Sequence, residues 1–316
     1  CHSELVSESK IEAETSSAWQ SFKYYILMNK FLVLFFISFS LSAQIRGVVK
    51  DSISGEPIPF VNIWVENETI GTTSEVNGRF SLDIKEEKVL VFSALGYETK
   101  KISSKTDLIL LKPKVFELNE VIIEQPKFKK EIEIGKTKNN GFHEVYNAGP
   151  IIRAKFFPFQ EKHIETKFLK EISILTKAEI DSTSFKIRIF SVGTDGFPDK
   201  DLVEDDIFVY VKKGNRKMTI DISKYRLEFP EKGLFVAFET LLIKKNEHEI
   251  LVQNNKTNNT FTLTNYYPYF KHNFVDREHT FSFYGGGWKK QKKYKYSDGS
   301  NDLKIFEPAI TLILTN

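Results

Sequence analysis

The chain has 316 residues, of which 41% are hydrophobic and 28% charged; these values are typical of a globular protein of about two domains and exclude a disordered or membrane-embedded chain. The formal charge of +3 is small for this length and the lysines form no long basic run, so we expect no nucleic-acid partner. The 28 phenylalanines, against two methionines, accompany many Val, Ile and Thr residues and favour strands. We therefore predict an all-β protein.

The first 43 residues carry two segments that we do not expect in the mature protein. A positive start at Met28–Lys30, an apolar run of about 11 residues and a small-residue exit have the layout of a signal peptide at 28–43, cleaved after Ala43. The run is too short for a bilayer about 30 Å thick, so no transmembrane segment is expected in the mature chain; a buried core helix is the alternative. Residues 1–27 would be an extra extension, either an over-extended reading frame or a real extension with an internal anchor.

Residues 44–125 are predicted to form a small antiparallel β-sandwich. Apolar and polar residues alternate in Phe60–Val65, Arg79–Ile84 and Val89–Phe92, and turn residues separate these runs. Asn77-Gly78 predicts a type I′ turn, because both central positions of that turn need a positive φ, which Asn and Gly tolerate.

The order of motifs in this region resembles the carboxypeptidase-like regulatory domain. The motifs are Gly47-Val-Val-Lys-Asp51, Ser54-Gly-Glu-Pro-Ile-Pro-Phe-Val-Asn-Ile63, Gly71-Thr-Thr73, Asn77-Gly-Arg-Phe-Ser-Leu82 and Val91-Phe-Ser-Ala-Leu-Gly-Tyr-Glu98. The resemblance implies a seven-stranded transthyretin-like β-sandwich, common in exported proteins of Bacteroidetes. It also implies an accessory module, separate from the zinc peptidase that gives the family its name.

The segment Leu118–Ile123 is similar to the exit of this domain in TonB-dependent outer-membrane receptors. In those receptors a plug and a large membrane-embedded part follow. Fewer than 200 residues remain here, and we expect them to be too few for a complete receptor.

Residues 126–149 are charged and glycine-bearing and are predicted to be a linker. From 150 to 316 the strand patterns return, and no stretch with a 3.6-residue period competes with them. The predicted strands are Ile164–Leu175, Phe185–Val192, Ile207–Val211, Met218–Ile222, Leu234–Glu239, Phe261–Leu263, Thr280–Tyr284 and Ile310–Leu314. They predict a second β-sandwich, of jelly-roll type, and several of the runs are similar to jelly-roll domains of exported Bacteroidetes proteins.

No catalytic or cofactor motif is visible. The one cysteine is Cys1, so no disulfide within the chain and no cysteine nucleophile is expected. No His-Glu-x-x-His, Gly-x-Ser-x-Gly or phosphate-binding loop occurs. His272 and His279 are seven residues apart, a spacing that in a strand would place them on opposite faces; a zinc site built from them with Glu278 or Asp276 is conceivable but not favoured. We expect the body's histidines to be solvated loop residues: His143, His163, His248, His272 and His279.

The densest acidic group lies within 195–206, in a loop between two predicted strands. Hard oxygen ligands close together suit Ca²⁺, which makes calcium candidates of Asp195, Asp199, Asp201 and Asp205. The order of ligands in an EF-hand is missing, so we favour a solvated acidic turn. A pair of glycosidase carboxylates is conceivable here, but nothing in the sequence sets two acids at the required spacing of about 5–10 Å.

The last third of the chain mixes aromatic and basic residues. Exposed aromatic faces can stack on sugar rings and lysines attract anions, which predicts a binding surface for a glycan or another envelope polymer. Core aromatics that alternate with solvated lysines along a hairpin are the interpretation we favour. The candidate ligand surface is Tyr267, Tyr269, Trp288, Tyr294 and Tyr296.

Together these features predict an exported, non-catalytic protein of the cell envelope, in the periplasm, in the outer membrane or at the cell surface. Its first module would be a spacer or docking unit, and its second would bind a glycan or an envelope protein. Two alternatives remain. One is a hydrolase that acts on polysaccharide or peptide with catalytic acids in the second domain; the other is an accessory subunit of a TonB-dependent outer-membrane transporter.

Overall fold

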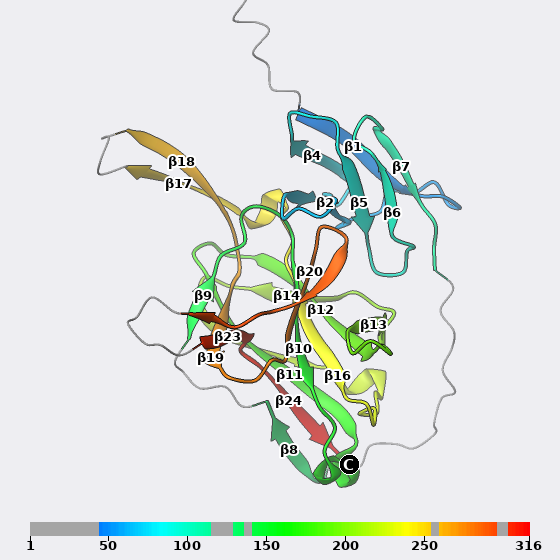
Figure 1. Ribbon diagram of the computed structural model, residues 1–316, viewed down its shortest axis with the longest axis vertical. Coiled ribbons are helices and arrows are strands. Elements are labelled where there is room, and N and C mark those ends of the chain that lie inside the picture. The colour runs from blue at the N-terminus through cyan, green and yellow to red at the C-terminus, as the bar shows by residue number, and fades with distance from the viewer. Residues whose placement is uncertain (1–43, 115–128, 136–140, 254–258, 296–302) are drawn as a thin grey trace, which may run out of the picture. The chain divides into compact units, whose positions relative to one another are not determined.

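The computed structural model describes residues 44–114, 129–135, 141–253, 259–295 and 303–316. Nearly all of their regular secondary structure is β-strand (Figure 1), which confirms the all-β prediction. The expected extension, the expected signal peptide, Leu118–Ile123 and Tyr296 lie outside the described residues. No helix in the described part of the chain is long and apolar enough to cross a membrane.

The first sandwich has the seven predicted strands. They are β1 (Gln44–Asp51), β2 (Asn62–Val65), β3 (Gly71–Thr73), β4 (Arg79–Asp83), β5 (Val89–Ser93), β6 (Lys100–Ser103) and β7 (Leu108–Leu111). One sheet has the order β4-β1-β7, with β1 and β7 parallel, and the other has the order β3-β2-β5-β6. Phe80 and Leu82 of β4 are buried while their neighbours are exposed, because successive side chains of a strand point to opposite faces.

The prediction of a type I′ turn at Asn77-Gly78 is wrong. The turn runs from Glu75, whose carbonyl accepts a hydrogen bond of 2.9 Å from the Gly78 amide. Only Gly78 has a positive φ, of 72°, and the Asn77 side chain accepts a bond from the Arg79 amide instead. The type I′ geometry matches the twist of two paired strands. Here β3 and β4 belong to different sheets, so the turn closes no hairpin.

Strand β2 is buried along its whole length. Ile63 and Val65 alternate with Asn62 and Trp64, and the latter two contact the second sandwich. Asn62 Nδ2 donates to Glu239 Oε1 at 2.7 Å, and Trp64 Nε1 donates to the Pro150 carbonyl at 2.6 Å. Both faces of β2 are therefore covered, which removes the usual alternation of buried and exposed residues.

The second sandwich has two large sheets (Figure 1). The seven-stranded sheet consists of β13 (Pro198–Asp201), β12 (Thr183–Val192), β16 (Leu234–Glu239), β10 (Ile152–Phe157), β20 (Thr280–Tyr284) and β21 (Gly287–Lys290), with β14 (Ile207–Val211) paired to β12. The eight-stranded sheet consists of β22 (Tyr294–Lys295), β23 (Leu303–Pro308), β19 (Tyr269–Val275), β11 (Phe168–Ala178), β24 (Ile310–Thr315) and β8 (Glu131–Ile134), with β15 (Gly214–Asp221) paired to β11 and β9 (Phe142–Glu144) to β19.

A separate two-stranded hairpin pairs β17 (Glu247–Gln253) with β18 (Thr260–Tyr266). Three short 3₁₀ helices complete the described elements: η2 (Glu161–Thr166), η3 (Ser223–Tyr225) and η4 (Lys244–Asn246). Helix η2 occupies the first residues of the predicted strand Ile164–Leu175, so that strand begins only at Phe168.

The segment that we expected to be a linker contributes two strands to the eight-stranded sheet. Strand β8 pairs with β24, and β9 pairs with β19. The described part of 126–149 is thus packed into the second sandwich and brings Glu144, at the end of β9, beside β10.

The register of β10 positions the site. Arg153 lies opposite Phe238 of β16, and Lys155 lies opposite Val236. Phe238 and Val236 belong to the main hydrophobic core of the second sandwich. Because paired residues point to the same face of a sheet, both cations of β10 point toward the core, and the residues that alternate with them point to the opposite face.

Candidate functional site

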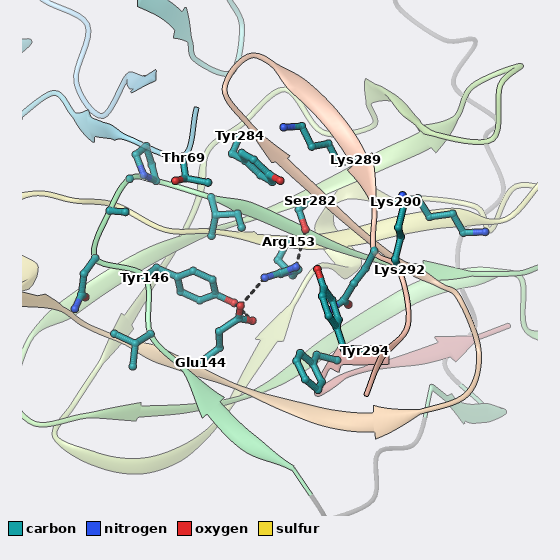
Figure 2. A pocket seen from close by; sticks show the side chains of 18 residues that line it. Thr69, Glu144, Tyr146, Arg153, Ser282, Tyr284, Lys289, Lys290, Lys292 and Tyr294 are labelled. Carbon is teal, nitrogen blue, oxygen red and sulfur yellow. Dashed lines mark hydrogen bonds and ion pairs between the residues drawn. The ribbon is translucent and has the colours of Figure 1, made fainter. Parts of the chain in front are cut away.

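A pocket of about 740 Å³ lies beside β10. We call it the Arg153 pocket. Its lining comprises Thr69, Glu144–Ile151, Arg153, Ser282, Tyr284, Lys289–Lys292, Tyr294 and Phe306. Most of these residues come from β9, β10 and the segment between them and from the β20–β23 region, and Thr69 comes from the loop between β2 and β3 (Figure 2). The volume is within the range of about 300–1,000 Å³ that is usual for small-ligand sites.

Arg153 is central among the labelled side chains of this pocket (Figure 2). Its Nη1 donates to Ser282 Oγ at 2.6 Å, and its Nη2 donates to Glu144 Oε1 at 2.7 Å. The side chain is only 9% exposed, so the backbone register of β10 and these two partners hold the guanidinium in place. Because a guanidinium has five N–H donors, two bonds do not exhaust it.

Glu144 connects Arg153 to a buried tyrosine and a buried histidine. Its Oε2 accepts a bond of 2.6 Å from Tyr146 Oη and lies 3.2 Å from His272 Nε2. Although burial alone would raise the pKa of Glu144, the charge of Arg153 brings it below the usual value. Glu144 is therefore a carboxylate at neutral pH.

His272, at the base of this group, is neutral. Burial lowers its pKa to about 4, although Glu144 acts in the opposite direction. Its Nδ1 lies 3.1 Å from the Phe270 carbonyl. Its Nε2 lies 3.2 Å from Glu144 Oε2 and 3.4 Å from the Tyr146 hydroxyl.

Lysines and tyrosines form the other side of the pocket (Figure 2). Lys289 Nζ lies 4.0 Å from the centre of the Tyr284 ring, a cation–π contact. Lys290 pairs with Glu278 at 3.2 Å, and both side chains are close to half exposed. Lys292 is exposed, and the Tyr294 ring stacks on Phe306 with 5.9 Å between centroids.

The lining residues that the structure describes thus include four cationic side chains and one carboxylate, Glu144. Hydrolysis by paired carboxylates needs a second acid in the same pocket, and none of the described lining residues supplies one. No group of three or more His, Cys, Asp or Glu residues in the described part of the chain is placed to hold a metal ion. The arrangement is suited to binding an anion.

Comparison with known proteins identifies the first sandwich. Residues 45–123 match the family model of the CarboxypepD_reg-like domain. The chain is 28% identical over 103 residues to the TonB-dependent receptor SusC of Bacteroides thetaiotaomicron, a match that covers 32% of this chain and 10% of the receptor. It is 33% identical over 100 residues to the TonB-dependent receptor P39 of Formosa agariphila, covering 29% of this chain and 10% of that receptor. The chain thus spans about a tenth of the length of the curated relatives it matches.

A structural match was also found with infectious bursal disease virus, strain Gx. It covers 86% of this chain and 59% of the viral chain at 11% identity, with a TM-score of 0.25. This similarity is too low to support an argument about fold or function.

The predicted ligand surface is divided by the fold. Tyr294 lines the Arg153 pocket. Tyr267 is 6% exposed in the main core and contacts Tyr269, with 4.3 Å between ring centroids. Trp288 is partly buried and packs edge-on against Phe190 and Phe283. The structure brings Tyr294 together with the cations, and it places the other described members elsewhere.

The four calcium candidates are all described residues, and they form no group of three or more that could hold a metal ion. Asp201 binds the Arg188 guanidinium with both oxygens, at 2.5 and 2.7 Å. Asp195 is exposed and accepts a bond from the Phe197 amide within a turn. Asp199 and Asp205 are exposed. Arg188 also pairs with Glu239, the residue that Asn62 of the CarboxypepD_reg-like domain contacts, so Asp201 is part of a polar network at that junction.

The expectation that the histidines are solvated loop residues is wrong for His272 and His163. His272 is in β19 with no exposed surface, and His163 is in η2 with 1% exposed. His143 and His248 lie in strands. Imidazole rings pack here among aromatic side chains, as in the contact of His163 with Phe229 at 5.0 Å between centroids.

The sequence motifs do not indicate Glu144, Arg153 or His272 as site residues. The sequence pattern places Glu144 in a linker, and the three residues come from strands that are separated by up to 128 residues in the chain. One usable signal was present: Arg153 and Lys155 alternate with apolar residues within Ile151–Phe157. Apolar residues flank the run on both sides, which is unusual for a strand with one face in water.

Proposed function

We propose that this chain is an exported, non-catalytic protein of the cell envelope whose second sandwich binds an anionic ligand in the Arg153 pocket. The observation that carries the proposal is the charge of that pocket, whose described lining residues include four cationic side chains and one carboxylate, that of Glu144. Glu144 is already paired with Arg153, and Lys290 is paired with Glu278. The positive field on a ligand therefore comes chiefly from Lys289 and Lys292. Low-dielectric walls strengthen such a field.

The CarboxypepD_reg-like domain would be the docking or spacer module. The matched relatives are described as TonB-dependent receptors, which supports an envelope location. It also supports a second candidate role, as an accessory subunit of such a transporter. Co-purification of a TonB-dependent receptor with the chain would favour that role.

Binding can be measured by isothermal titration of the purified chain with anionic and neutral probes at low and high salt. We expect the affinity for anionic probes to fall as salt rises, because salt screens exposed charges over about 8–10 Å. Lys292→Gln should weaken binding, whereas Lys232→Gln, at an exposed lysine outside the pocket lining, should not. Equal binding of neutral and anionic probes would contradict the proposal.

The envelope location has its own test. The mature protein should begin near Gln44 and fractionate with the periplasm, outer membrane or medium. Recovery of the chain from the cytosol with residues 1–43 intact would contradict export.

A further inference from the structure

The unsatisfied polar atoms of the Arg153 pocket narrow the class of its ligand. In the described part of the chain, ten buried side-chain N and O atoms have no hydrogen-bond partner. Three of the ten belong to residues that line this pocket: Asn147 Oδ1, Arg153 Nε and Gln291 Oε1. The large majority of buried polar atoms in native proteins are satisfied. All three atoms are closed to solvent in this conformation, so a ligand in the pocket would bond to them when their side chains turn toward it.

The two amide oxygens require hydrogen-bond donors. Asn147 Nδ2 already donates to Asn265 Oδ1 at 2.8 Å, so the oxygen is the unsatisfied end of that amide. A carbonyl oxygen can only accept, and a carboxylate or sulfate group alone has nothing to donate to it. A ligand that carries hydroxyl or amide donors beside its negative charge can satisfy these oxygens.

The aromatic residues favour a ligand with flat apolar faces. Tyr294 is 54% exposed at the pocket while its ring stacks on Phe306, so the stack presents an aromatic surface. Tyr284 lies on the other side of Arg153 in Figure 2. A few polar groups among aromatic walls are typical of sites for small organic ligands. A sugar ring has such a face, together with hydroxyl donors around its edge.

We propose that the Arg153 pocket binds an acidic sugar, that is, a saccharide unit that carries a carboxylate or a sulfate group beside free hydroxyls. The inference rests on the proposed function and specifies its ligand. Arg153 and the lysines take the anionic group, Asn147 and Gln291 accept from hydroxyls, and Tyr294 packs on the ring. An acidic peptide is the competing occupant, because its charge would suit the lysines.

The test is a titration of the purified chain with four short probes of matched length: an oligogalacturonate, a sulfated oligosaccharide, a neutral galacto-oligosaccharide and an oligoglutamate. We expect at least one acidic oligosaccharide to bind about tenfold or more tightly than both the neutral sugar and the peptide, a difference equivalent to about 1.4 kcal/mol. The first two probes show whether the anionic group is a carboxylate or a sulfate.

Substitutions at Lys292, which is exposed, and at Gln291, which is partly exposed, separate the contributions of charge and of hydrogen bonding to the affinity without disturbing the core. Lys292→Gln should lower the affinity for every anionic probe severalfold. Gln291→Leu should lower the affinity for the acidic sugar severalfold and leave the affinity for the peptide unchanged, because it removes a hydrogen-bond acceptor and no charge. Lys232→Gln is the control for charge outside the pocket.

The outcomes distinguish the two proposals. If oligoglutamate binds as tightly as the acidic sugars and responds to Lys292→Gln, the acidic-sugar inference is overturned and the anionic pocket stands. If no anionic probe binds, or if Lys292→Gln has no effect on any of them, the proposed function fails as well.

Discussion

Arg153 and Lys155 are two cations on the same face of β10, two residues apart, in two different kinds of cluster. Lys155 Nζ has three acceptors, Glu307 Oε1 at 3.0 Å and the carbonyls of Gly135 and Ile310 at 2.9 and 2.7 Å. An ammonium group has three donors, so Lys155 is fully satisfied within the protein. Arg153 has an unsatisfied Nε and lines a pocket. Burial of a charged side chain does not by itself indicate a binding role. An N–H donor that has no acceptor within the described part of the protein is more informative.

The partner of Lys155 is equally enclosed. Glu307 has no exposed side-chain surface and also accepts from Arg277 Nε at 2.6 Å. Burial lowers the pKa of Lys155 to about 8, with Glu307 acting in the opposite direction. The pair thus links the two sheets through a charge contact that water does not reach.

The largest expected effect tests the structural role of Lys155. Lys155→Met should lower the free energy of unfolding by about 3–5 kcal/mol, because it leaves the Glu307 charge buried with fewer partners. Urea denaturation measures the change. The double variant Lys155→Met/Glu307→Gln is the control and should recover much of the loss. A loss below about 1 kcal/mol for the single variant would show that the pair is not a structural cluster.

The second prediction concerns pH and belongs to the Arg153 side of the comparison. The folded-state pKa of His272 is about 4, against about 6.5 in an unfolded chain. Between these values the unfolded chain binds a proton that the folded chain does not, so the free energy of unfolding should fall as pH drops from about 6.5 to about 4, by up to roughly 3 kcal/mol.

Denaturation at several pH values measures this slope. His272→Gln cannot titrate and should flatten the curve in that window relative to the unchanged chain. An identical slope in both proteins would mean that His272 does not carry the effect.

Arg153→Met should cost less stability than Lys155→Met, about 1–3 kcal/mol. Glu144 would lose its charge partner, but its side chain is 25% exposed and keeps the Tyr146 hydroxyl. Affinity for anionic probes should fall more strongly than for any single lysine variant. If Arg153→Met destabilised the protein as much as Lys155→Met or more, the two clusters could not be told apart as a binding cluster and a structural one.

The smallest effect is expected at the exposed edge of the pocket. Lys292→Gln should change the free energy of unfolding by less than about 0.5 kcal/mol, as is usual for surface positions, while it weakens anion binding. Thermal unfolding without and with ligand separates the two effects. A marked loss of stability without ligand would show that Lys292 has a structural role, as Lys155 does.

The strands could be predicted because their signal is local. Phe80 and Leu82 alternate with polar neighbours, and the structure buries them in that order. The Asn77-Gly78 turn shows the limit of local reasoning, because its type depends on whether the flanking strands pair, which the dipeptide does not specify. The order of the motifs predicts the seven-stranded first sandwich, and the turn residues between the motifs indicate how the strands are spaced.

The pocket could not be predicted in the same way. Glu144, Arg153 and His272 meet because β9 pairs with β19 and the two sheets pack face to face. Strand pairing between distant segments depends on the whole arrangement of the sheets, and no short pattern in the sequence encodes it. Among the described members of the predicted ligand surface, only Tyr294, at the pocket edge, belongs to this site.

The covered outer face of β2 has a consequence for how the first domain can be handled in the laboratory. Trp64 has no exposed surface in this chain, and its indole N–H bonds to Pro150, which lies beyond the 45–123 family match. An excised fragment that ends near residue 125 would present this tryptophan and the Asn62 amide to solvent. Such a fragment should aggregate more readily than the intact chain. A soluble version would need a polar residue in place of Trp64. A CarboxypepD_reg-like domain of this sequence is therefore not freely transferable to another host protein.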